Sequence, residues 1–148
     1  MLMAELPIAV LMKLQPAPNR WSQPGWRPVA VHVDRADRAG INGAQRLRQV
    51  DADTCVMSGM SLQLYPDEND GYFENWVAPE PKVFLLWRIE QDTPVLVGAS
   101  ASYGEGTRML DSGDQADGIA MPADIHAWLG VYLRRHYTPP ARGGRGHG

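Results

Sequence analysis

The sequence predicts an α+β fold: one antiparallel, strongly curved meander sheet covered by one short and one long C-terminal helix. The first observation is an unbroken apolar run, Val83 to Trp87, whose β-branched and aromatic residues are typical of a strand buried on both faces. The second is a series of earlier segments that alternate apolar and polar residues between turn-rich connections. The third is a change of period after Ser100, where apolar residues recur every three or four positions, as in helices.

The composition is that of one globular domain, which we place at residues 1–138, followed by a flexible Pro/Arg/Gly tail at 139–148. The chain has 148 residues, 44% hydrophobic and 21% charged, with a net charge of −3. Cys55 is the single cysteine, so an intramolecular disulfide is impossible and a reducing cytoplasm is the expected compartment. The apolar N-terminus lacks a basic n-region, so we predict neither a signal peptide nor membrane insertion.

The first sixty residues are predicted to supply two strands and less regular segments. In the second strand Val29, Val31 and Val33 should share one face, because side chains alternate along a strand. In chain order we expect a strand at Pro7–Leu14, a strand at Arg27–Val33, a loop or single helical turn at 34–43, a short strand at 45–50 and a linker at 51–60.

The clearest predicted hairpin joins Ser61–Tyr65 to Tyr72–Val77 through the turn sequence PDENDG. Its acids lack the twelve-residue pattern of a calcium loop, so we interpret them as a polar turn. The central strand, Lys82–Ile89, follows, and a turn at 91–94 leads to a last strand at Val95–Ser100. Consecutive strands with short connections indicate an antiparallel meander.

The C-terminal third is predicted to form the two helices. Ser102 should be the N-cap of a short helix ending at Leu110, with Glu105 in the capping-box position. Residues 111–118 are interpreted as a loop. Pro122 is expected to be the first residue of a longer helix ending at His136. Its apolar stripe should face the sheet and consists of Ile125, Trp128, Leu129, Tyr132, Leu133 and His136.

No catalytic group, metal site or cofactor is predicted. The four histidines have no partner at a metal-ligand spacing, and a G-x-S-x-G serine elbow is absent. Cys55 is expected to be a small buried hydrophobe. Gly104–Leu110 (GEGTRML) allows two interpretations: a capped helix start, or a glycine-rich turn that holds phosphate with Arg108.

Arg20, Trp21 and Trp26 form the most suggestive surface group. Arginine and tryptophan are the residue types that dominate binding hot spots, and here they lie beside prolines in a loop. The alternative is that the two tryptophans close one end of the sheet. We do not predict nucleic-acid binding, because the tail offers two arginines and no interleaved aromatic residue.

Four stretches resemble an uncharacterised bacterial family, a domain of unknown function often encoded beside genes of molybdenum-dependent formate dehydrogenase. They are PIAVLMKLQPAPNRW, SLQLYPDENDGYFENWVAPEPKVFLLWR, PVLVGASASYGEGTRMLDSGDQADGIAMP and IHAWLGVYLRRHY. Some members of that family are labelled molybdopterin-guanine dinucleotide biosynthesis proteins. The motif positions that match its pattern are Asn19, Arg20, Trp21, Glu80, Pro81, Lys82, Trp87, Arg88 and Tyr103.

This resemblance implies an accessory role in the maturation or assembly of formate dehydrogenase. Together with the missing catalytic groups and the Arg/Trp surface, it leads to the hypothesis of a non-enzymatic accessory protein that acts by binding a protein partner, such as a formate dehydrogenase subunit. The expected partner-binding residues are Asn19, Arg20, Trp21, Trp26, Glu80, Lys82 and Arg88. The competing hypothesis is a protein or enzyme of molybdenum cofactor biosynthesis that binds a pterin or nucleotide. Its expected contacts are Tyr103 and Arg108, assisted by Arg88.

Overall fold

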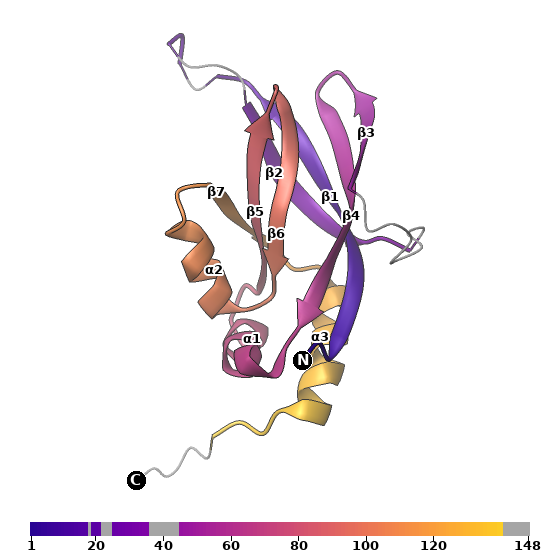
Figure 1. Ribbon diagram of the computed structural model, residues 1–148, viewed down its shortest axis with the longest axis vertical. Helices are drawn as coiled ribbons and strands as arrows, with labels where there is room; N and C mark the ends of the chain where they lie inside the picture. The colour runs from indigo at the N-terminus through magenta and orange to yellow at the C-terminus, as the bar shows by residue number, and fades with distance from the viewer. Residues whose placement is uncertain (18, 22–24, 36–44, 141–148) are drawn as a thin grey trace.

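The computed structural model describes residues 1–17, 19–21, 25–35 and 45–140 (Figure 1). Most of the segment predicted as a loop at 34–43, and the tail from 141, therefore lie outside the described residues. In chain order the elements are β1 (Ala4–Gln15), β2 (Gly25–Val33), β3 (Arg46–Asp51), β4 (Thr54–Leu64), the 3₁₀ turn η1 (Pro66–Glu68), α1 (Asn69–Trp76), β5 (Lys82–Glu90), β6 (Thr93–Ser100), α2 (Tyr103–Leu110), β7 (Gln115–Ala120) and α3 (Ala123–His136).

The strands form two antiparallel sheets. One is four-stranded, in the order β2-β1-β4-β3, and the other is three-stranded, in the order β6-β5-β7. The predicted α+β class with antiparallel pairing is therefore confirmed. The single, strongly curved meander sheet was wrong: there are two sheets, neither strongly curled, because α1 separates β4 from β5 and the strands after it start a new sheet (Figure 1).

The core lies between the two sheets and follows the two-residue period of the strands. Ile8, Val10 and Met12 of β1 are fully buried, and Val83 and Leu85 of β5 meet them in one cluster. Burying each such side chain contributes about 1.5–3 kcal/mol. Cys55 lies in this cluster as the buried hydrophobe that the sequence predicts.

The other face of β5 is covered by α2. Phe84 lies against Gly106, where a Cβ atom would come within 2.6 Å of the Phe84 ring. Any larger residue at position 106 would therefore push α2 away from the sheet. This close approach explains how an almost continuous apolar run is buried or half-buried on both faces.

A β-bulge overturns the expected face of Val29. Leu11 pairs with Ala30 and Met12 with Pro28, so Val29 is the extra residue of β2. Its side chain is 40% exposed, whereas that of Val31 is buried. The alternation in RPVAVHV cannot reveal this, because the bulge is set by pairing with β1.

The predicted hairpin after Ser61 was also wrong. Residues 54–64 form one long strand, β4, so the expected linker at 51–60 is a turn followed by most of that strand. The expected strand Tyr72–Val77 is instead mostly helix α1. The acids interpreted as a polar turn lie on η1 (Asp67 and Glu68) and on α1 (Asp70 and Glu74) rather than in a hairpin turn. Tyr72 and Asn75, three residues apart, both point into the interior, which a helix permits and a strand does not.

β7 replaces the second half of the predicted loop at 111–118. Its residues pair along β5 from Lys82↔Ala120 to Trp87↔Gln115, opposite the edge that β6 occupies. Asp117 accepts a hydrogen bond from the indole Nε1 of Trp87 at 2.7 Å. A segment as polar as QADGIA has no strand pattern of its own. It forms a strand because the edge of β5 is available for backbone pairing.

Both predicted helices are present with small changes. The Ser102 Oγ caps α2 by accepting from the backbone N–H groups of Gly104 and Glu105, as predicted. In a capping box the Glu105 carboxylate would accept directly from the Ser102 N–H. Here the Ser100 hydroxyl lies between them: it accepts from the Ser102 N–H and donates to Glu105. In α3 the expected first residue, Pro122, is the N-cap.

The apolar stripe of α3 is confirmed except at its end. Ile125, Leu129, Tyr132 and Leu133 are buried and Trp128 is partly buried, whereas His136 is exposed and packs on the Tyr132 ring at 4.8 Å. With Leu64, Tyr72 and Ala101 the helix forms a second cluster at the lower end of Figure 1.

Replacing Asn75 by Ala is expected to destabilise the fold by about 3 kcal/mol. Its buried amide makes three hydrogen bonds, to the N–H and C=O of Lys82 and to the C=O of Ala101. Urea unfolding followed by tryptophan fluorescence measures the change. Gln63→Ala, which removes an exposed amide, is the control and should cost less than about 0.5 kcal/mol. A similar cost for both variants would contradict this account.

Alkaline pH is expected to weaken the contact between α1 and the C-terminal part of α3. Burial raises the pKa of Tyr72 and Tyr132, and the hydrogen bond to Asp70 raises the pKa of Tyr137 to about 12. Because unfolded tyrosine ionises near pH 10, this stabilisation is complete below about pH 10 and is lost as the pH rises toward 12. The free energy of unfolding should therefore fall above about pH 10, less steeply in Tyr137→Phe. A flat profile across that window would refute the prediction.

Candidate functional site

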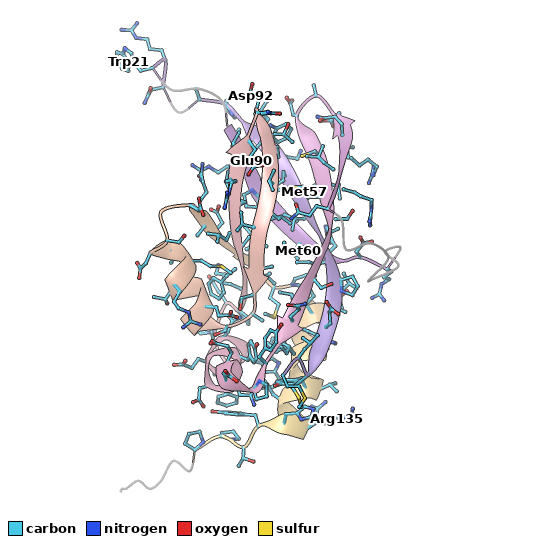
Figure 2. The ribbon with its side chains drawn as sticks, viewed as in Figure 1. Trp21, Met57, Met60, Glu90, Asp92 and Arg135 are labelled. Carbon is cyan, nitrogen blue, oxygen red and sulfur yellow. The ribbon has the colours of Figure 1, made fainter. Side chains whose placement is uncertain are left out.

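The far end of the β1–β2 hairpin presents an arginine–tryptophan pair. The Asn19 Oδ1 accepts a hydrogen bond from the backbone N–H of Trp21 at 2.9 Å, which forms an Asx turn. The Arg20 guanidinium carbon lies 4.9 Å from the centroid of the Trp21 ring, within range of a cation–π contact. The Trp21 side chain is 80% exposed, and Figure 2 shows it projecting beyond the sheets.

Trp26 differs from Trp21 in its environment. It pairs with Leu14 across the hairpin and packs, partly buried, against the core cluster. The two interpretations of the tryptophans therefore apply to different residues. Trp26 packs against the core where the two strands meet their connecting loop, and Trp21 is exposed within that loop.

The other residues expected to bind a partner are spread along β5. Lys82 begins the strand, and its Nζ lies 3.9 Å from a carboxylate oxygen of Glu80. Arg88 follows six residues later. Its guanidinium nitrogens lie 3.6 Å from a carboxylate oxygen of Glu90 and 3.7 Å from one of Asp114. Six residues of a strand span about 20 Å. The structure thus brings Asn19, Arg20 and Trp21 together, and it places Glu80 and Lys82 at the beginning of β5 and Arg88 toward its end.

The residues of the competing ligand hypothesis contact other side chains of the protein at its surface. Arg108 donates to one carboxylate oxygen of Glu68 at 2.8 Å, and the Ser102 hydroxyl donates to the other at 2.7 Å. The Tyr103 ring packs beside Phe84, with centroids 5.7 Å apart. The N-terminus of α2 therefore already has a carboxylate from η1 beside it, in the position that an anion would favour.

A tryptophan–histidine pair was missed by sequence reasoning. The Trp76 and His126 rings are stacked, with centroids 4.9 Å apart and an interplanar angle of 4°. Each donates a ring N–H to the backbone carbonyl of the other, at 2.9 Å, so Nε2 of His126 carries a proton. Fifty residues separate the two, and neither segment holds a signal for the contact. The pair borders a surface pocket of about 450 Å³, whose other lining residues are Ala78, Pro79, Pro81, Met121 and Ala123.

The part of the chain that the structure describes contains no group of three or more His, Cys, Asp or Glu side chains placed to hold a metal ion. Every described helix is too short or too polar to cross a lipid bilayer, α3 being the longest at 14 residues.

A family profile described as "Protein of unknown function (DUF3305)" matches residues 7–145. The chain belongs to this family. The match spans all seven strands apart from the first residues of β1, all three helices and the hairpin that carries Arg20 and Trp21. No curated protein and no solved structure matches the chain. The resemblance to an uncharacterised domain family is thus confirmed.

Replacing Glu68 by Ala should cost about 2 kcal/mol of stability, and replacing Arg108 by Ala less than about 1 kcal/mol. Glu68 accepts from the buried Ser102 hydroxyl and lies near the positive end of α2, whereas the Arg108 side chain is 64% exposed. Thermal and urea unfolding of the two variants measure the difference. Equal losses would show that the ion pair, rather than the cap, is the important contact.

Proposed function

We propose that this protein is a non-enzymatic accessory protein of formate dehydrogenase maturation or assembly, and that it acts in the cytoplasm by binding a protein partner. The observation that carries the binding role is the exposed Trp21 with Arg20 stacked on it. The formate dehydrogenase link rests on the resemblance of the four sequence stretches. Cytoplasmic action is supported by the unpaired, buried thiol of Cys55.

The arginine–tryptophan pair has the physical properties of a binding hot spot. A tryptophan offers a large apolar surface with few rotatable bonds, and its burial on binding is strongly favourable. The Asx turn at Asn19 and the stacked Arg20 hold the ring before the partner arrives, which lowers the entropy cost of association.

The polar clusters of the protein support binding over catalysis. Glu68, Ser102 and Arg108 satisfy one another, and the Asn75 amide is used entirely by backbone groups. These side chains stabilise the junctions between elements. A pterin or nucleotide that used Arg108 would have to share its guanidinium with the carboxylate of Glu68.

The double variant Arg20→Ala/Trp21→Ala is expected to weaken partner binding by about 100-fold or more, because truncating a hot-spot tryptophan alone costs at least about 2 kcal/mol. Tagged protein is purified at low salt from its native host, grown with formate and molybdate, and formate dehydrogenase subunits in the eluate are quantified by mass spectrometry. The wild type should retain a subunit and the double variant should lose it, with melting temperatures within a few degrees.

The matched control is Val131→Ala/Arg135→Ala, which removes an exposed apolar residue and an exposed arginine from α3 (Figure 2). This control should retain the subunit. Equal recovery with the Arg20/Trp21 variant would reject the proposed surface. A wild-type protein that elutes alone with a bound pterin or nucleotide would reject the accessory role.

A further inference from the structure

The two sheets differ in how their outward faces are covered. The three-stranded sheet has α2 against it, with Gly106 on Phe84 and Met109 beside Gly98. The helices α1 and α3 lie at one end of the molecule, and the side of the four-stranded sheet turned away from the core has no described helix packed across it (Figure 1). We name this side the outer face. By alternation and register its central part consists of Ala9, Leu11 and Lys13 (β1), Arg27, Ala30 and His32 (β2), Val56 and Ser58 (β4), and Arg46 and Arg48 (β3), and the acids Asp51 (β3) and Glu5 (β1) lie toward its two ends.

The charges on the outer face are arranged around an apolar centre. Leu11 lies between Ala30 and Val56, and all three are only half-buried. The exposed basic residues stand on the flanking positions: Lys13 and Arg27 on one side, and Arg46 and Arg48 on the edge strand β3. The bulged Val29 adds exposed apolar surface beside them.

Lys13 and Arg27 are direct cross-strand partners. Like charges placed opposite each other on a sheet are destabilising. Neither side chain, nor that of Arg48, forms an ion pair or hydrogen bond with any described residue. An external carboxylate between them would relieve the repulsion.

We propose that the outer face is a docking surface for an acidic amphipathic helix of a partner protein. The apolar stripe of the helix covers Leu11, Ala30 and Val56, and its flanking carboxylates meet the basic residues. A nine-residue strand is about 30 Å long, as is a helix of about 20 residues, so the two match in length. The same helix-on-sheet packing covers the three-stranded sheet, where the helix comes from the chain itself.

The side chains of the outer face favour an acidic helix over two other anionic partners, RNA and a membrane. Single-stranded RNA would need aromatic side chains for base stacking, and the outer face has none apart from the His32 ring. An anionic membrane needs exposed aromatic or long apolar groups to insert, whereas the centre of this face consists of Ala, Leu and Val. Both remain as outcomes of the test.

The test uses the full chain and two synthetic helical peptides of about 20 residues. One has a Leu/Ala stripe flanked by Glu, and the other has Lys at every Glu position. The Glu peptide should bind with a Kd on the order of 10–100 μM at low salt and more weakly at high salt. Amide shifts should occur at Leu11, Ala30 and Val56 in ¹H–¹⁵N spectra, with none on α2.

Charge reversal at two positions supplies the decisive comparison. Lys13→Glu/Arg48→Glu should weaken Glu-peptide binding by about tenfold or more and create binding of the Lys peptide. Folding should be kept, because Glu at position 13 faces Arg27. Arg134→Glu/Arg135→Glu, with the same change of charge on α3, should leave binding within about twofold.

The Arg20→Ala/Trp21→Ala variant should bind the Glu peptide as the wild type does, since the outer face is a surface separate from the hairpin end. Loss of binding in that variant or in the α3 control, absence of peptide binding, or shifts confined to other elements would overturn the proposal. So would tighter binding of phosphatidylglycerol vesicles or of a single-stranded RNA than of the Glu peptide at the same salt concentration.

Discussion

The side-chain amide of Asn75 is the contact on which the arrangement of this protein depends. It is fully buried and bonds to both backbone groups of Lys82 and to the carbonyl of Ala101. One side chain thereby joins α1, the first residue of β5 and the segment that leads into α2. A buried amide without such partners would cost several kcal/mol, so the three segments are held in one geometry.

The protein has one end in which the contacts between distant elements are concentrated, around this junction, and an opposite end formed by exposed hairpin connections. Around Asn75 lie the Tyr72–Tyr132 contact, the Trp76–His126 stack and the Glu68–Ser102–Arg108 network, and each of them links elements distant in sequence. The β1–β2 and β5–β6 hairpins extend from that end toward the other (Figure 1). Residues that occupy a hairpin end are released from packing, and for that reason Trp21 is exposed.

The two proposed surfaces are physically linked through β1 and β2. These strands carry the Arg20–Trp21 pair at their connection and Lys13 and Arg27 at its base. A partner that engages the hairpin end would pass close to the basic outer face. Two modest contacts on one hairpin give higher avidity than either alone, provided that one partner reaches both.

The sequence alone determined the elements whose signals are local. The apolar run of β5, the Ser102 cap of α2 and the stripe of α3 need only neighbouring residues to be recognised, and the Asn19–Trp21 group of the candidate site is likewise contained in one loop. The tertiary structure decided what depends on distant partners. It made Tyr72–Trp76 a helix by burying Tyr72 and Asn75, made β7 a strand by offering the edge of β5, turned Val29 outward through a bulge and placed Lys13 opposite Arg27. Pairing energies across the fold exceed the weak intrinsic preferences of such segments, so their conformation is set only when the partner strand or helix is present.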